Sequence, residues 1–404
     1  MSVVDVAIAG GGPAGASTAV HLARAGHQVV VIERSPAWRW RACGVFSSPA
    51  AVDALRRLRF DAAILTESAH QIAAMRVEAP DVAAFSLTYG DDGRMTHPAV
   101  GFDRERLDEG LLAMAREAGA EVRLGSVVTG AALGGPTQRL TLRLEDGSDS
   151  LKARVVIGAD GLRSVVARDA GVARPARLGR RVGLTFHVTE PRDTDARRHA
   201  RMVILPDAYC GLAPIPGNRL NIGIVLRGAR WRRRLAEVGA PAAAGEILAA
   251  IPRTADDPVA WANQPRTDSI EGAVPLGHRV SHRAGEGWLL VGDAAGFLDP
   301  LTGEGLHRAL ISAELAAEVV DAHLRGAPGG LAPYARAMDH RFRTKDAVTL
   351  LIQAVLARPA LVSHVARRLA RDATLRETMG LVIGDLVPAS RALRPDFLIG
   401  LLRP

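Results

Sequence analysis

The feature that most constrains the fold of this chain is a glycine-rich turn near its start, Gly10-Gly-Gly-Pro-Ala-Gly15. An apolar run at 5–9 precedes the turn, and a helical stretch at 16–25 follows it. A second apolar run at 28–32 then ends in the acidic residue Glu33. Strand, turn, helix and strand in this order predict a β-α-β unit of a parallel sheet that binds a dinucleotide.

Each glycine of the turn has its own reason to lack a side chain. Gly10 permits the tight turn, Gly12 lets a pyrophosphate approach the backbone, and Gly15 lets the helix pack closely against the strand. Glu33 lies 18 residues beyond Gly15, where a carboxylate accepts a hydrogen bond from a ribose hydroxyl. The glycine spacing alone is weak evidence, but here the two strands, the helix and the acid accompany it.

A second glycine-rich loop, 291–305, lies between the apolar run 288–291 and a helix predicted from Leu306. Asp293 ends the strand, and glycines at positions 292, 296, 303 and 305 leave the backbone open to close approach. The helix start directs free N–H groups and its positive dipole end at the loop, which suits the negative charge of a reduced flavin. Taken alone, the loop is equally well a plain turn, but the N-terminal motif favours the cofactor site.

The rest of the chain divides into two kinds of pattern. Short alternating runs with Pro and Gly turns fill 178–285, which predicts a separate β-rich lobe, interrupted by a helix at 235–251. From Tyr334 onward the pattern is helical and predicts a cap. The other predicted elements are a helix at 50–65, short strands at 72–100 with a turn at 91–93, a helix at 102–119, a strand at 121–124, a hairpin through 146–147, a strand from 154 and a helix at 164–170.

The net charge of +8 comes almost wholly from arginine, since Lys152 and Lys345 are the only lysines among 51 basic residues. The arginines are spread along the chain and aromatic residues make up only 4%, so we expect no nucleic-acid partner. Attraction to acidic membrane surfaces or to an anionic carrier stays open, which leaves room for peripheral membrane contact. Without an apolar run of eighteen residues or a charged and apolar leader, we expect a cytoplasmic protein with no transmembrane segment.

Cysteine and histidine spacing predicts no metal site. Cys43 and Cys210 cannot make a disulfide framework and stand in no ligand spacing, and the twelve histidines are scattered. Cys43 precedes Gly44 in a loop rich in Arg and Trp. That pair either places a small polarisable side chain beside a cofactor ring or is a buried cysteine followed by a turn glycine.

Three motifs, in this order, resemble the flavoprotein hydroxylase superfamily: Gly10-x-Gly12-x-x-Gly15, Gly158-Ala-Asp-Gly-Leu-Arg-Ser-Val-Val-Ala-Arg168 and Gly292-Asp293. The resemblance covers essentially the whole chain and implies that FAD is the cofactor. Pro300-Leu-Thr-Gly-Glu-Gly305 and Cys43-Gly44 are most similar to the geranylgeranyl reductase branch, which reduces isoprenoid double bonds with reduced FAD. Aromatic hydroxylases usually carry a His where this chain has Gly296, and a Pro-Pro-x-Gly-x-Gly loop.

The resemblance also implies roles for individual residues. Glu33 would bind the adenosine ribose, Arg104 the pyrophosphate or ribityl region, and Asp293 the ribityl chain. Asp160 and Arg163 would lie on the other side of the cofactor, unless Asp160 is a turn carboxylate that caps the helix at Ser164. The implied cofactor-binding set is Gly10, Gly12, Ala14, Gly15, Glu33, Arg34, Arg104, Val128, Asp160, Asp293, Gly303, Gly305 and Leu306. The implied substrate pocket is Tyr209, Gly211, Ala213 and Pro300, with Cys43 and Tyr209 as the candidate catalytic residues.

The substrate motif departs from the branch it resembles. Pro206-Asp-Ala-Tyr-Cys-Gly-Leu-Ala-Pro214 fits the frame Pro-x-x-Tyr-x-Trp-x-Phe-Pro and keeps Tyr209, but Gly211 and Ala213 replace the two large aromatic residues. These replacements predict a substrate site wider than that of a lipid reductase. Flavin-dependent halogenases carry two tryptophans in this frame and need an active-site lysine. Lys152 precedes a strand of the nucleotide sheet and Lys345 lies in the predicted cap, so halogenation is disfavoured.

We therefore expect an α/β protein with a discontinuous, Rossmann-like FAD-binding domain of the glutathione reductase and p-hydroxybenzoate hydroxylase type. A β-rich substrate domain and a C-terminal helical cap would complete it. The predicted boundaries are 1–70, 101–177 and 286–330 for the first part, 71–100 and 178–285 for the second, and 331–404 for the third.

The expected reaction is delivery of a hydride from flavin N5 to a C=C bond of a hydrophobic substrate, such as an isoprenoid, a polyketide or a carrier-tethered molecule. The alternatives are an NAD(P)H- and O2-dependent hydroxylase and a flavin-binding protein without turnover. The chain has no second Gly-x-Gly-x-x-Gly motif to hold a nicotinamide permanently. The reductant is therefore expected to be NAD(P)H bound transiently or a reduced protein donor.

Overall fold

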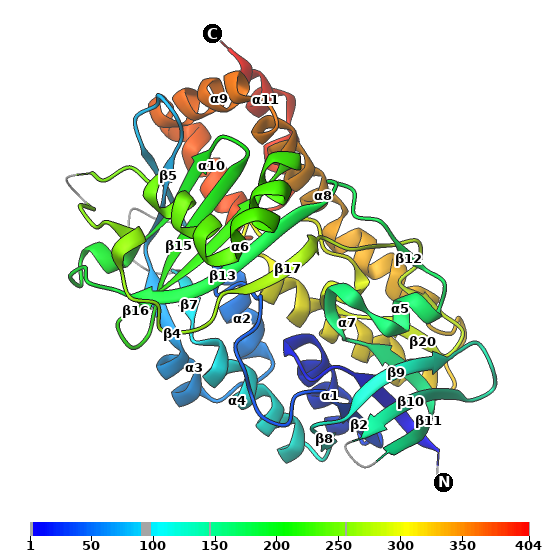
Figure 1. The fold of residues 1–404 in the computed structure, drawn as a ribbon. Helices are drawn as coiled ribbons and strands as arrows, with labels where there is room; N and C mark the ends of the chain where they lie inside the picture. Colours follow the sequence, from blue (N-terminus) through cyan, green and yellow to red (C-terminus); the bar gives the residue numbers. More distant parts are fainter. Residues whose placement is uncertain (1–2, 90–97, 145–146, 255–256, 404) are drawn as a thin grey trace.

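The computed structural model describes residues 3–89, 98–144, 147–254 and 257–403. Figure 1 shows the sheet that carries the N-terminal strand at one end of the molecule and a helical region at the other, so that the two termini lie far apart. A second large sheet lies between these two regions, beside the helices. The predicted turn at 91–93 and Asp146 of the predicted hairpin lie outside the described residues.

The nucleotide sheet forms around the first strand. Strand β1 (Val4–Ala9) pairs in parallel with β2 (Val29–Ile32) on one side and with β11 (Gly147–Gly158) on the other. All four residues of β2 are buried, as expected for a parallel strand covered on both faces. The other strands of this sheet are β8 (Glu121–Arg123), β9 (Val127–Ala132), β10 (Gln138–Leu144), β19 (Ala284–Gly285) and β20 (Trp288–Leu290).

The helices of this part follow the predicted order. Helix α1 (Pro13–Arg24) begins with a proline, which needs no N–H partner in the first turn, and packs against α4 (Arg104–Glu117) and α7 (Gly305–Leu324). The single helix predicted at 50–65 is wrong: the chain forms α2 (Pro49–Arg57) and α3 (Ala62–Ser68) instead. The break has a local cause, because Arg59 has a φ of 60° and Asp61 caps the second helix by accepting a hydrogen bond from Ile64 N at 2.9 Å.

The second large sheet has the strand order β17-β13-β16-β15-β14-β5-β6. We call it the substrate sheet. Its strands are β5 (Ala74–Glu78), β6 (Phe85–Thr88), β13 (Arg181–Thr189), β14 (His199–Leu205), β15 (Ala208–Ile215), β16 (Arg219–Leu226) and β17 (Glu271–Leu276). Two small sheets complete the strands: β3 (Phe46–Ser47) with β4 (Ala69–Ile72) and β7 (Ala99–Phe102), and β12 (Ala173–Arg174) with β18 (Arg279–Val280).

The two faces of the substrate sheet have different partners. One face packs its alternate residues, such as Leu184, Leu212 and Ile222, against α6 (Gly228–Ala249) in one hydrophobic core. Helix α6 begins earlier than the helix predicted at 235–251 and is kinked at Gly239, two residues before Pro241, which cannot donate a helical hydrogen bond. The opposite face therefore points away from α6, toward the C-terminal helices and the glycine-rich loop 291–305. We call this loop the cofactor loop.

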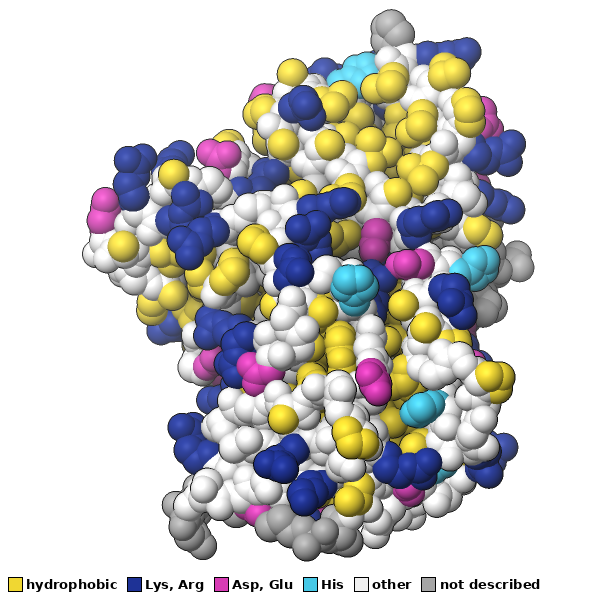
Figure 2. All heavy atoms as spheres, turned by 90° about the vertical axis from the view of Figure 1, so that its right-hand side faces the viewer, with side chains coloured by type: hydrophobic (Ala, Val, Ile, Leu, Met, Phe, Trp, Pro, Cys, Tyr) yellow, Lys and Arg dark blue, Asp and Glu magenta, His cyan; other side chains and the backbone are white. Residues whose placement is uncertain are grey.

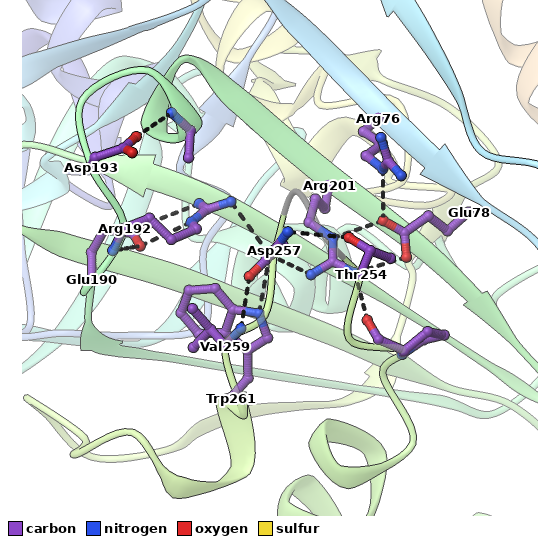
Figure 3. Close-up of polar contacts among 12 residues, drawn as sticks. Arg76, Glu78, Glu190, Arg192, Asp193, Arg201, Thr254, Asp257, Val259 and Trp261 are labelled. Carbon is purple, nitrogen blue, oxygen red and sulfur yellow. Dashed lines mark hydrogen bonds and ion pairs between the residues drawn. The ribbon is translucent and has the colours of Figure 1, made fainter.

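A buried ion network links β5 to the neighbouring strand β14 within the substrate sheet (Figure 3). The guanidinium of Arg201 forms two hydrogen bonds to the carboxylate of Glu78, at 2.8 and 2.7 Å, and a further one to Asp257. Arg192 pairs with Glu190 at 2.7 Å and its guanidinium lies over the ring of Trp261. Because the charges in this network are paired, we assign it to holding the fold rather than to binding a ligand.

The predicted helical cap is confirmed from α8 onward. It contains α8 (Ala332–Leu356), α9 (Pro359–Arg371), α10 (Ala373–Ile383) and α11 (Pro395–Leu402). Tyr334 ties α8 to the nucleotide sheet, because its buried hydroxyl donates to Leu290 O at 2.6 Å. Among the described residues, no single helix is both long and apolar enough to cross a membrane, while α8 and α9, bent by 116° at their junction, pass on length and composition only as a pair.

Candidate functional site

The glycine turn has the geometry that its sequence predicts. Gly10 has a φ of 104°, which favours glycine, and a Cβ at Gly15 would lie 1.9 Å from Gly10 O. Both glycines are therefore needed by the protein itself. Gly12 is different, because a Cβ built there meets nothing within 4 Å. Its backbone at the N-terminus of α1 is thus open to a ligand, as an approaching pyrophosphate requires.

Glu33 closes the turn from the end of β2. Its buried carboxylate accepts hydrogen bonds from Gly11 N at 2.8 Å and from Ser35 N at 3.0 Å. Two backbone donors fix the carboxylate beside the glycine turn, at the carboxyl ends of β1 and β2. This is the edge of a parallel sheet where nucleotides bind.

The loop after β20 brings Asp293 to the same region. The one-turn helix Gly292–Ala295 contacts α1, and a Cβ at Gly292 would lie 2.8 Å from the Cβ of Ala14. Asp293 is half-buried, and within the described chain its carboxylate accepts no hydrogen bond. Burial raises the pKa of Asp293 to about 6, although Arg104 and Arg308 act in the opposite direction. Such a carboxylate can accept hydrogen bonds from a ligand, and the ribityl hydroxyls of FAD are donors of this kind.

Cys43 and Gly44 lie beside this carboxylate. Arg104 donates to Gly44 O at 2.8 Å and forms two hydrogen bonds of 3.0 Å to Asp108 one turn further along α4. Burial lowers the pKa of Arg104, but Asp108 more than compensates, so its pKa is raised. Burial raises the pKa of the Cys43 thiol to about 11. Arg104 therefore positions the Cys43-Gly44 segment, and its expected contact with the pyrophosphate or ribityl region stays a prediction.

Asp160 does cap the helix that follows it. Its Oδ2 accepts from Val165 N at 2.7 Å and from Val166 N at 3.4 Å at the start of α5 (Val165–Asp169). Its Oδ1 is buried without a hydrogen-bond partner, and burial raises the pKa of the carboxyl group. Arg163 turns away and donates to Val274 O at 2.9 Å. The turn Gly161–Arg163 still contacts the turn of Asp293, which keeps Asp160 at the edge of the site.

The other expected cofactor residues occupy varied positions. Ala14 and Leu306 are buried at the starts of α1 and α7, where backbone N–H groups are free. Gly303 has a φ of 67° and a Cβ there would meet the ring of Phe46, whereas a Cβ at Gly305 meets nothing within 4 Å. Arg34 is exposed and Val128 is half-buried on β9, and within the described part of the chain neither one forms a hydrogen bond with the glycine turn.

The substrate sheet presents a strip without side chains on the face that points away from α6. Gly183, Gly211 and Gly223 lie on the adjacent strands β13, β15 and β16, with Gly211 directly opposite Gly223. Each is half-exposed although both of its neighbours along the strand are buried. A Cβ at Gly223 would meet nothing within 4 Å, and one at Gly211 would meet only the flexible end of Met202, at 3.5 Å, and Gly223 O, at 3.9 Å. Gly183 is different, because a Cβ there would lie 3.1 Å from the side chain of Leu276, which covers that end of the strip. We call these three residues the glycine floor.

Tyr209 and Asp299 connect the glycine floor to the cofactor loop. Tyr209 lies two residues before Gly211 and donates its hydroxyl to Asp299 Oδ1 at 2.6 Å. Asp299 also pairs with Arg181 and accepts from Leu301 N at 2.9 Å, and burial raises its pKa. Burial and this carboxylate together raise the pKa of Tyr209. Pro300, the other expected pocket residue, follows Asp299 and is half-buried.

Ala213 and Lys345 differ from their expected surroundings. Ala213 is buried in the core that contains Trp40 and Val45, so its small side chain leaves no open surface for a substrate, and the wider site stays a prediction for Gly211 alone. Lys345, expected to be remote in the cap, reaches Glu304 of the cofactor loop at 3.3 Å. Asp385 and Val382 O also hold its ammonium group, at 2.8 and 2.5 Å, which leaves it poorly placed for halogenation.

The arrangement fits FAD better than a mononucleotide. Open backbone occurs at Gly12 for a pyrophosphate and at Gly44 and Gly305 further along, while Glu33 and Asp293 provide carboxylates at both ends. These positions belong to loops that lie at one edge of the nucleotide sheet. Among the described residues no cluster of His, Cys, Asp and Glu suited to a metal ion occurs.

Residues 3–341 match the family described as FAD binding domain. The chain belongs to the FAD binding domain family. The predicted fold class and the predicted cofactor FAD are thereby confirmed for this FAD-binding protein. The boundaries of its three parts, like the roles of individual site residues, remain proposals.

The relatives of this FAD-binding protein include several reductases. It is 27% identical over 401 residues to a menaquinone reductase of Mycolicibacterium smegmatis, with 95% of this chain and 92% of the relative covered. It is 29% identical to a digeranylgeranylglycerophospholipid reductase of Methanopyrus kandleri, with 78% of this chain and 76% of the relative covered. The resemblance to geranylgeranyl reductases is confirmed, and the reductase relatives favour reduction over oxygenation.

Solved structures show the fold alone. A flavoprotein/dehydrogenase of Cytophaga hutchinsonii has a TM-score of 0.83 at 18% identity and covers 97% of this chain and 95% of its own. The flavin-dependent brominase Bmp2 has a TM-score of 0.79 at 18% identity, covering 95% and 94%. The fold is therefore shared by reductases and halogenases, and the site must decide between them.

The sequence did not reveal every residue around the glycine floor. His187 on β13 forms a buried pair with Asp268, and the ring of Trp40 lies against that histidine. Asp299 lies within the loop 291–305, but the sequence pattern does not assign it to the site. The richness of the loop at 34–44 in Arg and Trp was the available signal for Trp40, whereas the separation of His187 and Asp268 by 81 residues leaves no local motif.

Proposed function

We propose that this FAD-dependent protein reduces a C=C bond of a hydrophobic substrate that lies on the glycine floor. The observation that carries the proposal is the contact between the cofactor loop and the floor, where Tyr209 donates to Asp299 at 2.6 Å. This contact brings the strand that carries Gly211 next to the loop that would hold the flavin ring, and the backbone of Gly211 and Gly223 is open there. The reductase relatives support reduction as the reaction.

The residues of this chain bind and orient the two reactants. When bound, FAD supplies the hydride that reduction of the double bond requires. Gly12 and Glu33 would hold the dinucleotide end, and Asp293 the ribityl chain, while Cys43 would lie beside the flavin ring. Tyr209 is kept protonated by burial and by Asp299, and its proton is held in the hydrogen bond to Asp299, so Tyr209 would position the cofactor loop against the substrate sheet.

The proposed reductant is NAD(P)H bound transiently or a reduced protein donor, and the proposed location is the cytoplasm.

Figure 2 shows hydrophobic side chains gathered over the end of the molecule where Figure 1 places the C-terminal helices, with Lys and Arg side chains around them. Ile399 and Leu402 of α11 are more than half exposed. These features favour peripheral contact with an anionic lipid surface, which sedimentation with anionic and with neutral vesicles would test.

The deciding experiment is an anaerobic single turnover. Protein reduced beforehand is mixed without oxygen with a prenylated naphthoquinone or a polyprenyl lipid, and the products are analysed by mass spectrometry. Reoxidation of the flavin together with the gain of two hydrogen atoms at a C=C bond supports the proposal. If no saturated product forms, and labelled O2 admitted afterwards places a labelled oxygen atom in the product, the protein is a hydroxylase instead.

A further inference from the structure

His187 projects from the substrate sheet on the same face as the glycine floor. Alternate residues of β13, such as Phe186 and Val188, pack into the core shared with α6, so His187 points to the other side. Cross-strand pairing places His187 opposite Asn221 and Thr185 opposite Gly223. The histidine thus stands one pleat away from the floor, on the side opposite to Tyr209.

Asp268 holds this histidine rigidly through two contacts. Its Oδ1 accepts from His187 N at 2.8 Å, and its Oδ2 pairs with the ring Nδ1. Thr267 N also donates to His187 O at 3.0 Å, which keeps the Asp268 segment alongside β13. A carboxylate at Nδ1 fixes the proton of the ring on that nitrogen and directs Nε2 into the protein.

The other ring nitrogen has no partner. His187 is only 4% exposed, and its buried Nε2 forms no hydrogen bond to any described residue. An unpaired buried polar atom is costly and calls for a physical explanation. A structural role is already fulfilled by Nδ1 and the backbone, so it does not explain a free Nε2.

Trp40 makes the surroundings of this nitrogen aromatic. Its ring centroid lies 4.3 Å from that of His187, and its Nε1 donates to Thr185 O at 3.4 Å. The amide of Asn221 is engaged with Thr185 Oγ1 at 3.1 Å and with Phe186 O at 3.3 Å. Beside the floor, one free ring nitrogen therefore stands in an otherwise apolar and internally paired wall.

We propose that His187, oriented by Asp268, is the polar anchor that binds one ring oxygen of the substrate. The inference rests on the proposed function and specifies its substrate class: a largely apolar molecule with a carbonyl or hydroxyl at one end. Because Nδ1 donates to Asp268, Nε2 accepts from a hydroxyl when the ring is neutral and donates to a carbonyl when the ring is protonated. The apolar body of the substrate then lies over Gly223 and Gly211.

The test compares two probes that differ only in one hydroxyl group. Oxidised holoprotein is dialysed against 2-methyl-3-prenyl-1-naphthol, whose hydroxyl can donate to Nε2, and against its hydrocarbon counterpart, 2-methyl-3-prenylnaphthalene. We expect the wild-type protein to bind the naphthol about tenfold more tightly, which is the effect of one good hydrogen bond. His187→Phe should abolish this preference and leave the hydrocarbon affinity unchanged.

Two further variants and one control complete the design. Asp268→Asn, which loses the carboxylate that orients the ring, should lower the preference, and His187→Gln, which keeps a polar amide, should restore part of it. His199→Phe, at an exposed position on β14, should leave the preference intact. Titration with FAD and reduction by dithionite, unchanged in each variant, confirm that the site is assembled.

Two results would overturn the inference: a wild-type protein that binds both probes equally, or a His187→Phe protein that binds FAD normally and keeps the tenfold preference. Both are separate from failure of the proposed function. If the anaerobic turnover gives no saturated product while the naphthol preference depends on His187, the anchor stands and the reaction is wrong. If reduction occurs but the preference is absent, the proposed function stands and the anchor at His187 is wrong.

Discussion

Tyr209 of the substrate sheet and Asp299 of the cofactor loop share a hydrogen bond of 2.6 Å in a buried place, so neither segment can shift without the other. We predict that Tyr209→Phe lowers the free energy of unfolding by about 1–3 kcal/mol, because a buried carboxylate loses a donor. Urea unfolding measures the change. Tyr89→Phe is a matched control with a small expected effect, since the buried Tyr89 hydroxyl has no hydrogen-bond partner among the described residues. Equal losses in both variants would contradict the role given to Asp299.

The two outer glycines of the N-terminal turn and the middle one should respond differently to substitution. Gly12→Val should leave the apoprotein stable but abolish FAD binding in a fluorescence titration, because the added side chain enters open space that the pyrophosphate needs. Gly15→Ala should instead prevent folding, since its Cβ would lie 1.9 Å from Gly10 O. A Gly12→Val protein with normal FAD affinity would place the cofactor elsewhere.

Asp293 makes the stability of the apoprotein depend on pH. Burial raises its folded-state pKa to about 6 from an ordinary 3.8, so the folded protein binds more protons than the unfolded chain between these values. Stability should therefore fall as pH rises through that window. At pH 7, the free energy of unfolding of Asp293→Asn, measured by urea unfolding, should exceed that of the wild type by about 1–3 kcal/mol. The same variant should bind FAD more weakly. Parallel stability curves for the two proteins from pH 4 to 7 would show that Asp293 is not responsible.

Filling the glycine floor should block turnover without loss of the cofactor. A tryptophan at Gly211 would project over Gly223, where a substrate would lie, and its Cβ has room beside Met202. We expect Gly211→Trp to keep its FAD affinity and to lose most of its substrate reduction in the single-turnover assay. Gly245→Trp on α6, remote from the floor, is the control for the bulk of the added ring. Unchanged turnover in Gly211→Trp would move the substrate site away from the floor.

Cys43 should behave as a protonated thiol at neutral pH, because burial raises its pKa to about 11. Alkylation by iodoacetamide at pH 7 should accordingly be slow, and Cys43→Ala should lower substrate reduction more than FAD affinity. Cys210, with a pKa raised to about 12 in the core of the substrate sheet, is the internal reference for an inert thiol. Rapid alkylation of Cys43 alone would mean that it is a thiolate and that its part in the reaction is different.

Most of the elements that could be predicted from the sequence depend on residues that are close together in the chain. The turn at Gly10 and the start of α7 were predictable because their glycines, strands and helices are neighbours in the chain. The break between α2 and α3 was missed because it depends on the backbone of Arg59, which no motif marks. The pairing of Arg104 with Asp108 was within reach of the sequence, since the two residues are one helical turn apart.

The site around the glycine floor depends on long-range pairing. Three glycines from three strands become neighbours only through the register of β13, β16 and β15. His187 and Asp268 meet because the segment before β17 runs alongside β13. Lys345 was placed in the cap correctly, yet α8 is long enough to carry it back to Glu304. These contacts follow from tertiary structure, and no spacing rule along the chain contains them.

Helix α8 gives the protein a particular order of assembly during synthesis. It touches the nucleotide sheet through Tyr334, the cofactor loop through Lys345 and the substrate sheet through Gln353, which lies 3.3 Å from Arg181. Asp385, which forms an ion pair with Lys345, lies further along the chain and is synthesised later still. A nascent chain on the ribosome therefore carries both sheets long before the residues that lock them together emerge.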